Sequence, residues 1–199
     1  KALPPPPTLP LQALSDHAGL RMKLVIQRVL RASVDVEGRQ VASIGRGLLL
    51  LLGIKKGDGR QQAEQLARKV VKLRLWPGLT EETQPWASSV LTREFELLVV
   101  SQFTLFATFK KPKPNYNAAM GGDEARELYE AFVEECRSEL GDPGRVATGV
   151  FGADMQVSLT NDGPVTVELS AEPPVSGGSS GAADAAAAGA GAPAARSMP

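Results

Sequence analysis

Alternating and continuous runs of apolar residues divide the centre of the chain into strands and helices. Residues 23–36 are rich in β-branched side chains, which predicts a strand, and residues 41–44 predict a short strand that returns after a turn. Residues 47–54 form a continuous apolar run, typical of a strand buried on both faces. In residues 57–75 the apolar side chains recur at helical spacing, which predicts an amphipathic helix.

The following residues repeat this order of strand and helix. Residues 95–106 predict a buried strand that runs into polar residues. Residues 122–140 carry an apolar stripe and predict a second helix, with Asp123 as its N-cap. Strict alternation predicts two further strands, at 153–160 and 164–169. Together the elements predict an α+β domain with two main helices and mostly antiparallel β-sheets.

The two ends of the chain differ in composition from this central region. Residues 1–21 contain a run of prolines and little periodicity, so we expect a flexible Pro-rich leader. Residues 171–199 are mainly Ala, Gly, Ser and Pro, and we expect a low-complexity disordered tail because they offer little apolar surface to bury. The folded domain is therefore predicted to span residues 22–170.

Charge and composition narrow the classes of function. Acidic and basic residues balance at 22 each, which argues against a globally basic nucleic-acid binder but leaves room for a local basic patch. Cys136 is the only cysteine, so no disulfide forms within the chain and a reducing, cytoplasmic location is expected. The sequence shows neither an apolar run of the roughly 18 residues that span a membrane nor a secretory signal.

Histidine is almost absent, which limits the chemistry available. His17 is the only histidine and lies in the predicted leader, remote from the folded domain. A Ser-His-Asp or Cys-His catalytic set, or a zinc site with a histidine ligand, would have to use it. An enzyme with this sequence is therefore expected to work without imidazole.

Two polar features of the predicted strands allow both a structural and a functional interpretation. Arg28 lies on an otherwise apolar strand face, where it either extends to water at a strand edge or is anchored to backbone carbonyls near a site. Residues 101–105 bring polar side chains to the end of a strand, where they either cap the next segment or line a site. Ser101 and Thr104 have no evident activating base, so backbone amides at this turn are candidates for an oxyanion hole.

Two further motifs are also open to two interpretations. Lys110, Lys111 and Lys113 lie on a proline-stiffened loop, which is either a solvated surface or a contact for phosphates. The step from Gly163 to Pro164 has two interpretations. It either forms the turn of a β-hairpin or provides a backbone conformation that the protein uses directly, because an X-Pro bond can adopt the cis form at low cost.

Three stretches together resemble one known family. They are MKLVIQRVLRASV, VSQFTL and FGADMQVSLTNDGPVTVEL, at residues 22–34, 100–105 and 151–169. In this order and spacing they resemble the D-aminoacyl-tRNA deacylase (D-tyrosyl-tRNA(Tyr) deacylase) family over about residues 22–170. The resemblance implies a compact homodimer that hydrolyses the ester joining a D-amino acid, or glycine, to the terminal adenosine of tRNA. It implies no metal and no cofactor.

The resemblance also implies roles for individual residues. Gly163 and Pro164 would form a cis step that enters the partner subunit's pocket and screens the substrate's chirality, with Arg28 holding this motif in place. The ester would be lined by the catalytic segment Ser101, Gln102, Phe103 and Thr104, with the amides of the last two near the oxyanion. The adenosine and amino acid would meet a wall of Phe151, Gly152 and Met155.

Two other functions remain as alternatives at this stage. A non-catalytic protein on the same fold would bind the tRNA end, or a nucleotide, without shortening the lifetime of the ester. A small-molecule esterase would use Ser101 as its nucleophile.

Overall fold

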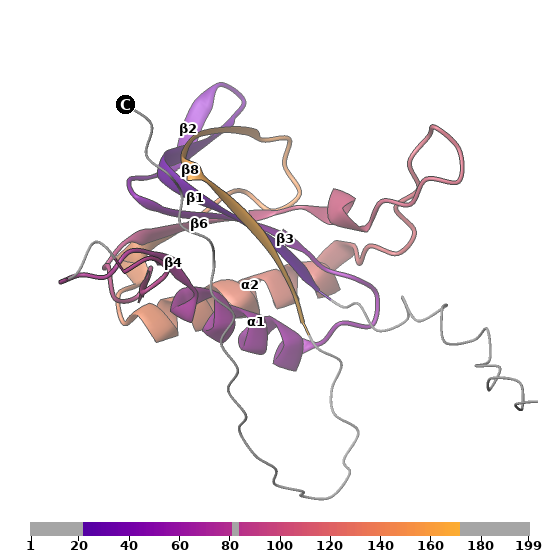
Figure 1. The fold of residues 1–199 in the computed structure, drawn as a ribbon. Helices are drawn as coiled ribbons and strands as arrows, with labels where there is room; N and C mark the ends of the chain where they lie inside the picture. Colours follow the sequence, from indigo (N-terminus) through magenta and orange to yellow (C-terminus); the bar gives the residue numbers. More distant parts are fainter. Residues whose placement is uncertain (1–21, 81–83, 172–199) are drawn as a thin grey trace, which may run out of the picture.

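The computed structural model describes residues 22–80 and 84–171 (Figure 1). The expected leader and most of the expected tail lie outside the described residues. The elements, in chain order, are β1 (Lys23–Val36), β2 (Arg39–Ile44), β3 (Gly47–Gly53), α1 (Arg60–Lys72), β4 (Arg74–Trp76), β5 (Ser88–Ser89), β6 (Glu96–Ser101), the 3-10 helix η3 (Phe103–Phe106), α2 (Gly122–Leu140), the 3-10 helix η4 (Pro143–Arg145), β7 (Val146–Thr148) and β8 (Gln156–Ser170).

The main sheet is mixed, so the expectation of mostly antiparallel sheets is met only in part. Its order is β2-β1-β3-β6-β7, and β8 pairs with β1. β1 is antiparallel to β2, β3 and β8, whereas β3–β6 and β6–β7 are parallel. The parallel pairs arise because α1 lies in the connection from β3 to β6 and α2 in the connection from β6 to β7. A helical crossover of this kind returns the chain in the same direction.

Both helices cover the same face of the sheet, as Figure 1 shows. Their apolar stripes pack with Leu50, Leu97 and Val99 into the larger core cluster, in which Phe132 is fully buried. Cys136 lies in this core as the sequence predicts, and burial raises the pKa of its thiol. The thiol therefore stays protonated and inert at neutral pH. None of the helices among the described residues is long and apolar enough to span a membrane.

The sheet curls over itself and encloses a second core cluster. β2 contacts β6 and β7, although these strands are not its neighbours in the sheet. The long strand β1 serves both cores, because Leu24 and Ile26 belong to the larger cluster and Val29 and Val34 to the smaller one. This change of face coincides with a register shift between β1 and β8 in the region of Val29.

The last two predicted strands form a single strand, which excludes the hairpin interpretation of the Gly-Pro step. β8 runs without interruption through Gly163 and Pro164, and both of its halves pair with β1. Its first half packs on the smaller core and its second half on the larger one. The register shifts around these two residues leave the Gly-Pro step as a bulge beside Arg28 rather than as the tip of a turn.

The second helix has the predicted bounds but a different cap. Gly121 is its N-cap residue, with extended backbone dihedral angles, and Asp123 lies in the first turn. The carboxylate of Asp123 can still stabilise the helix there through the helix dipole. Gly141 ends the helix in the left-handed conformation, which favours glycine.

Candidate active site

The site is built where two parallel strands end side by side. Leu52 of β3 pairs with Ser101 of β6, and the amide of Gln102 donates to the Leu52 carbonyl at 2.7 Å. The chain then turns directly into η3. This turn approaches β3 so closely that a Cβ added to Gly53 would lie 3.0 Å from Cβ of Leu105. A glycine at position 53 therefore permits the close approach that forms one wall of the site.

The polar residues of the turn hold one another in place. The side-chain amide of Gln102 donates through Nε2 to the Thr104 hydroxyl at 2.6 Å, so both side chains have a fixed direction. Phe103 and Thr104 are the first two residues of η3, and amides at the start of a helix have no acceptor within that helix. The oxyanion hole expected from the sequence at these two amides therefore stays a prediction.

A mainly apolar pocket of about 310 Å³ opens at this turn. Its walls come from the ends of β3 and β6, from the start of α2 and from the loop before β8. The residues lining it are Leu52, Ile54, Ser101, Gln102, Phe103, Tyr116, Ala119, Met120, Gly121, Gly122, Ala125, Phe151 and Gly152. Such a volume with few polar groups suits an aromatic base or an uncharged side chain.

The back wall of the pocket is held by a second set of contacts. The Tyr129 hydroxyl donates to the carbonyl of Val99 at 2.8 Å, and burial raises the pKa of this phenol. The rings of Tyr129 and Phe151 lie 5.5 Å apart, and the Arg126 guanidinium lies 5.1 Å from the Phe151 ring centre. Phe151 is therefore fixed between an aromatic ring and a cation.

The structure brings together most, but not all, of the residues predicted for this pocket. Ser101, Gln102, Phe103, Phe151 and Gly152 line it, and Thr104 joins them through its hydrogen bond to Gln102.

Met155 packs against the smaller core instead of lining the pocket. A Cβ added to Gly149 would lie 2.7 Å from the Met155 sulfur, so Met155 is packed closely against this glycine.

Sequence reasoning missed the wall at residues 116–125. This segment has no regular periodicity, and its small residues, Ala118 to Gly122 apart from Met120, give no chemical signal of their own. The one signal that could have indicated a pocket wall is a run of small side chains next to a helix start, because small side chains leave space for a ligand.

Arg28 and the Gly-Pro step form a separate cluster. The Arg28 side chain is 14% exposed, and its Nε donates to the carbonyl of Asp162 at 3.0 Å. Its Nη1 donates to the carbonyl of Leu75, and its Nε lies 3.4 Å from the Asp162 carboxylate. Arg28 is therefore anchored to backbone carbonyls rather than extended into water. The bond between Gly163 and Pro164 is cis, and both residues are exposed.

This cluster and the pocket lie at opposite ends of the same strands. Arg28 is paired with Leu48, whereas the pocket begins at Leu52. Four residues of strand correspond to about 13 Å. The exposed Gly-Pro backbone is thus remote from the pocket of its own chain.

Comparison with known proteins decides the family. The family model described as D-Tyr-tRNA(Tyr) deacylase matches residues 25–170, which is most of the chain. The chain belongs to this family. Within the deacylase family, D-aminoacyl-tRNA deacylase 1 of Mus musculus is 44% identical over 153 residues, covering 77% of this chain and 72% of the relative. D-aminoacyl-tRNA deacylase of Haemophilus influenzae is 46% identical over 149 residues, covering 74% and 99%.

Solved structures agree with the deacylase fold. The structure of a protein named c-Myc DNA Unwinding Element Binding Protein has a TM-score of 0.70 and 42% identity, covering 77% of this chain and 99% of its own. A structure described as a probable eukaryotic D-amino acid tRNA deacylase has a TM-score of 0.67 over 76% of this chain. Its identity is 15%, so that likeness concerns the fold alone.

Proposed function

We propose that this protein hydrolyses the ester between a D-amino acid, or glycine, and the 3′-terminal adenosine of tRNA. It thereby frees tRNA from wrongly attached amino acids during translation. The observation that carries the proposal is family membership, with relatives named D-aminoacyl-tRNA deacylase that are 43–46% identical. The pocket supports it, because an apolar cavity beside two backbone donors matches an adenosine that carries an ester.

The chemistry proposed is backbone-assisted hydrolysis. Water adds to the ester carbonyl carbon, and negative charge develops on the carbonyl oxygen. The amides of Phe103 and Thr104 donate to this oxygen, and one such donor typically contributes about 2.7–4 kcal/mol to transition-state stabilisation. The tetrahedral intermediate, from which the added water has lost one proton, collapses by breaking the bond to the ribose oxygen, which takes up that proton. The amino acid and tRNA are released.

The side chains of the turn are proposed to hold the backbone amides and the ester in position, without reacting themselves. We expect Ser101→Ala and Thr104→Ala each to lower kcat/KM by no more than about tenfold, because each removes at most a neutral hydrogen bond of about 0.5–1.5 kcal/mol. Single-turnover hydrolysis of D-aminoacyl-tRNA measures this. A loss of three orders of magnitude in either variant, with an unchanged circular dichroism spectrum, would instead indicate a hydroxyl nucleophile.

The working unit proposed is a homodimer with cross-subunit sites. In one chain the Gly163-Pro164 backbone is exposed and lies at the opposite end of β3 from the pocket. The two can serve one substrate only if the Gly-Pro step of one subunit enters the pocket of the other. A two-fold axis would then create two identical sites.

Main-chain atoms would select between the D and L forms of the bound amino acid. The backbone of residues 163 and 164 has no large side chain that can move aside, and Arg28 fixes its direction. The side chain of an L-amino acid would meet this backbone, whereas that of a D-amino acid would point away. Exclusion of the wrong substrate in this way needs no specific contact with the right one.

We further propose that residues 22–170 are the deacylase domain and that it acts in the cytoplasm, without metal or cofactor. The buried cores and the matched residues fall within these bounds. The single cysteine, buried and protonated, agrees with a reducing compartment.

The direct test is hydrolysis of tRNA charged with either mirror image of one amino acid. The protein is expected to deacylate D-tyrosyl-tRNA at least 100-fold faster than L-tyrosyl-tRNA, a ratio that corresponds to a difference of about 2.7 kcal/mol between the two activation free energies. Release of radiolabelled tyrosine gives both rates. Equal rates for the two, or no hydrolysis of either, would refute the proposal.

A second candidate is binding to a nucleic-acid end without hydrolysis. It is favoured by one observation, the similarity to a structure named for binding a DNA unwinding element. The same assay separates the two, because a pure binding protein would leave the lifetime of the D-ester unchanged.

A further inference from the structure

We infer that the lysine-bearing loop at residues 109–114 is a binding surface for the single-stranded 3′ end of tRNA, next to the pocket. The inference rests on the proposed function, which puts only the terminal adenosine in the pocket. The nucleotides that precede it must leave over the pocket rim. The loop lies on the side of the rim formed by Phe103 and Tyr116.

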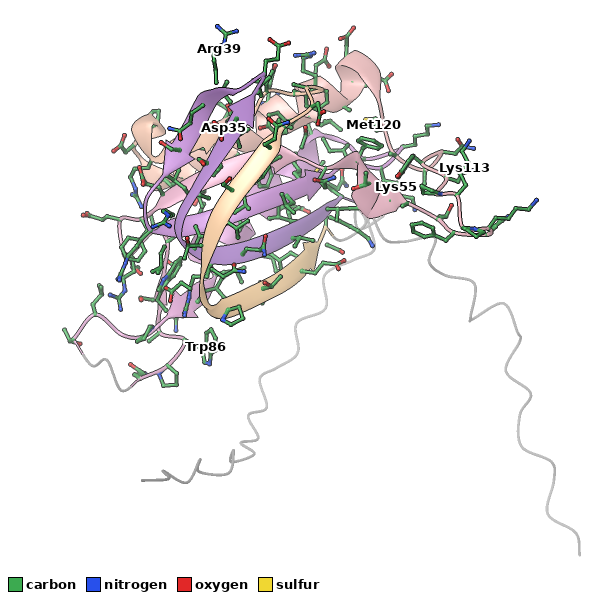
Figure 2. All side chains as sticks on the ribbon, turned by 90° about the horizontal axis from the view of Figure 1, so that it is seen from above. Asp35, Arg39, Lys55, Trp86, Lys113 and Met120 are labelled. Atoms are coloured by element: carbon green, nitrogen blue, oxygen red, sulfur yellow. The ribbon has the colours of Figure 1, made fainter. Side chains whose placement is uncertain are left out.

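The loop has a defined base and an exposed tip. Thr108 and Asn115 form a bridge with backbone hydrogen bonds of 2.8 and 2.9 Å, which closes the loop immediately before Tyr116. Two prolines restrict the backbone between them. Figure 2 shows Lys113 on this projecting loop, at the same end of the molecule as Lys55 and Met120.

The charged side chains of the loop itself are all positive. Lys110, Lys111 and Lys113 are exposed, and residues 97–122 contain no aspartate or glutamate. Within the part of the chain that the structure describes, the ion pairs involve other residues and leave these three lysines without an acidic partner. Lys56, also exposed, adds a charge nearby, because its amide donates to the Ala118 carbonyl at 3.0 Å.

Aromatic side chains accompany the lysines. Phe109 is 69% exposed at the start of the loop, and Phe103 is 54% exposed at the pocket rim. The Phe103 and Tyr116 rings contact each other edge to face, with centroids 5.0 Å apart. Exposed rings interleaved with cations are the combination that binds single strands, since bases stack on rings and phosphates meet lysines. A duplex or an acidic peptide would make no use of the rings.

The test compares two substrates and two matched variants. The first variant is K110Q/K111Q/K113Q, and the control is R39Q/R46Q/K69Q, which removes the same charge from β2, from the turn before β3 and from α1, at exposed residues that do not line the pocket. The substrates are D-tyrosyl-tRNA and D-tyrosyl-adenosine, which lacks every phosphate. Both are measured over a range of sodium chloride concentrations.

The loop variant is expected to lose tRNA activity only. Three phosphate contacts to a single strand contribute about 2 to the slope of log affinity against log salt, so kcat/KM for D-tyrosyl-tRNA should fall by order of 10- to 100-fold at about 0.1 M salt. Hydrolysis of D-tyrosyl-adenosine should stay within twofold of the wild type. The control variant should match the wild type on both substrates.

A second variant addresses stacking independently of charge. Phe109→Ala is expected to weaken binding of uncharged tRNA by about 5- to 100-fold. Val41→Ala, which trims an exposed apolar residue on β2, is the control and should leave binding unchanged. Both residues are exposed, so neither change should affect folding.

The outcomes separate this inference from the proposed function. If wild-type protein hydrolyses neither substrate, the proposed function fails. If it hydrolyses both and the loop variant loses no more tRNA activity than the control, the loop is not the binding surface. Equal losses on D-tyrosyl-tRNA and D-tyrosyl-adenosine would also overturn the inference.

Discussion

Replacing Arg28 by alanine is expected to lower kcat/KM for D-tyrosyl-tRNA by about 100-fold and to raise the relative rate on the L form. The side chain connects β1 to the carbonyls of Leu75 and Asp162, directly beside the Gly163-Pro164 step. Without it, this backbone can shift, and a displacement of about 1 Å in a site typically costs about 100-fold in rate. Arg28 is a positioning residue, so the ratio of the rates on D- and L-tyrosyl-tRNA distinguishes its role from a general effect on stability.

Matched arginine variants separate positioning from general stability. Arg145 is also held by backbone carbonyls, those of Val90 and Phe95, but contacts neither the pocket nor the Gly-Pro step. Arg145→Ala should lose comparable stability in urea and keep the D-to-L rate ratio. Arg28→Lys should lie between Arg28→Ala and the wild type, because lysine retains the charge without the forked geometry. An unchanged D-to-L rate ratio in Arg28→Ala would show that Arg28 does not position the Gly163-Pro164 backbone for chiral selection.

Gly47→Ala is expected to have the largest effect on stability. Gly47 begins β3 opposite Glu96 of β6, and a Cβ added there would lie 1.9 Å from the Glu96 carbonyl oxygen. Relieving this overlap requires the two strands to separate in the centre of the main sheet. The expected loss exceeds about 4–5 kcal/mol, a large part of the 5–15 kcal/mol that stabilises a typical domain.

Urea unfolding followed by far-UV circular dichroism measures this loss. Gly121→Ala serves as the comparison, because its φ of −129° suits any residue and no atom lies within 4 Å of the added Cβ. That variant should change stability by less than about 1 kcal/mol. A Gly47→Ala protein as stable as Gly121→Ala would show that β3 and β6 are not packed as described.

The sequence predicted those parts of the fold that local patterns determine. The helix at 122–140 has the predicted bounds, since its apolar stripe is long and regular. The apolar run at 47–54 is nearly coextensive with β3. The parallel pairing of β3 with β6, in contrast, depends on which strands meet after a helical connection, and no local pattern encodes that.

The bulge in β8 shows the same limit. Pro164 was compatible with a hairpin turn in isolation, and only pairing of both halves of β8 with β1 excludes it. The same register shift moves Met155 and Val165 onto different cores, which alternation along one strand does not anticipate.

The site could be predicted only in part for a similar reason. The family pattern brought Ser101 and Phe151 to attention, and they line one pocket. The wall at residues 116–125 and the close approach at Gly53 depend on tertiary contacts between segments far apart in sequence.

The central claim is that the pocket of one subunit and the Gly163-Pro164 backbone of another form one site. The most direct measurement mixes two variants, each expected to have about 1% or less of wild-type activity, under conditions that exchange subunits. Arg28→Ala keeps its pocket but loosens its Gly-Pro step, and Ala119→Trp fills its pocket but keeps that step. Half of the dimers are then mixed, each with one complete site, so the account predicts recovery of about a quarter of wild-type activity on D-tyrosyl-tRNA. A mixture no more active than the two variants measured separately would contradict it.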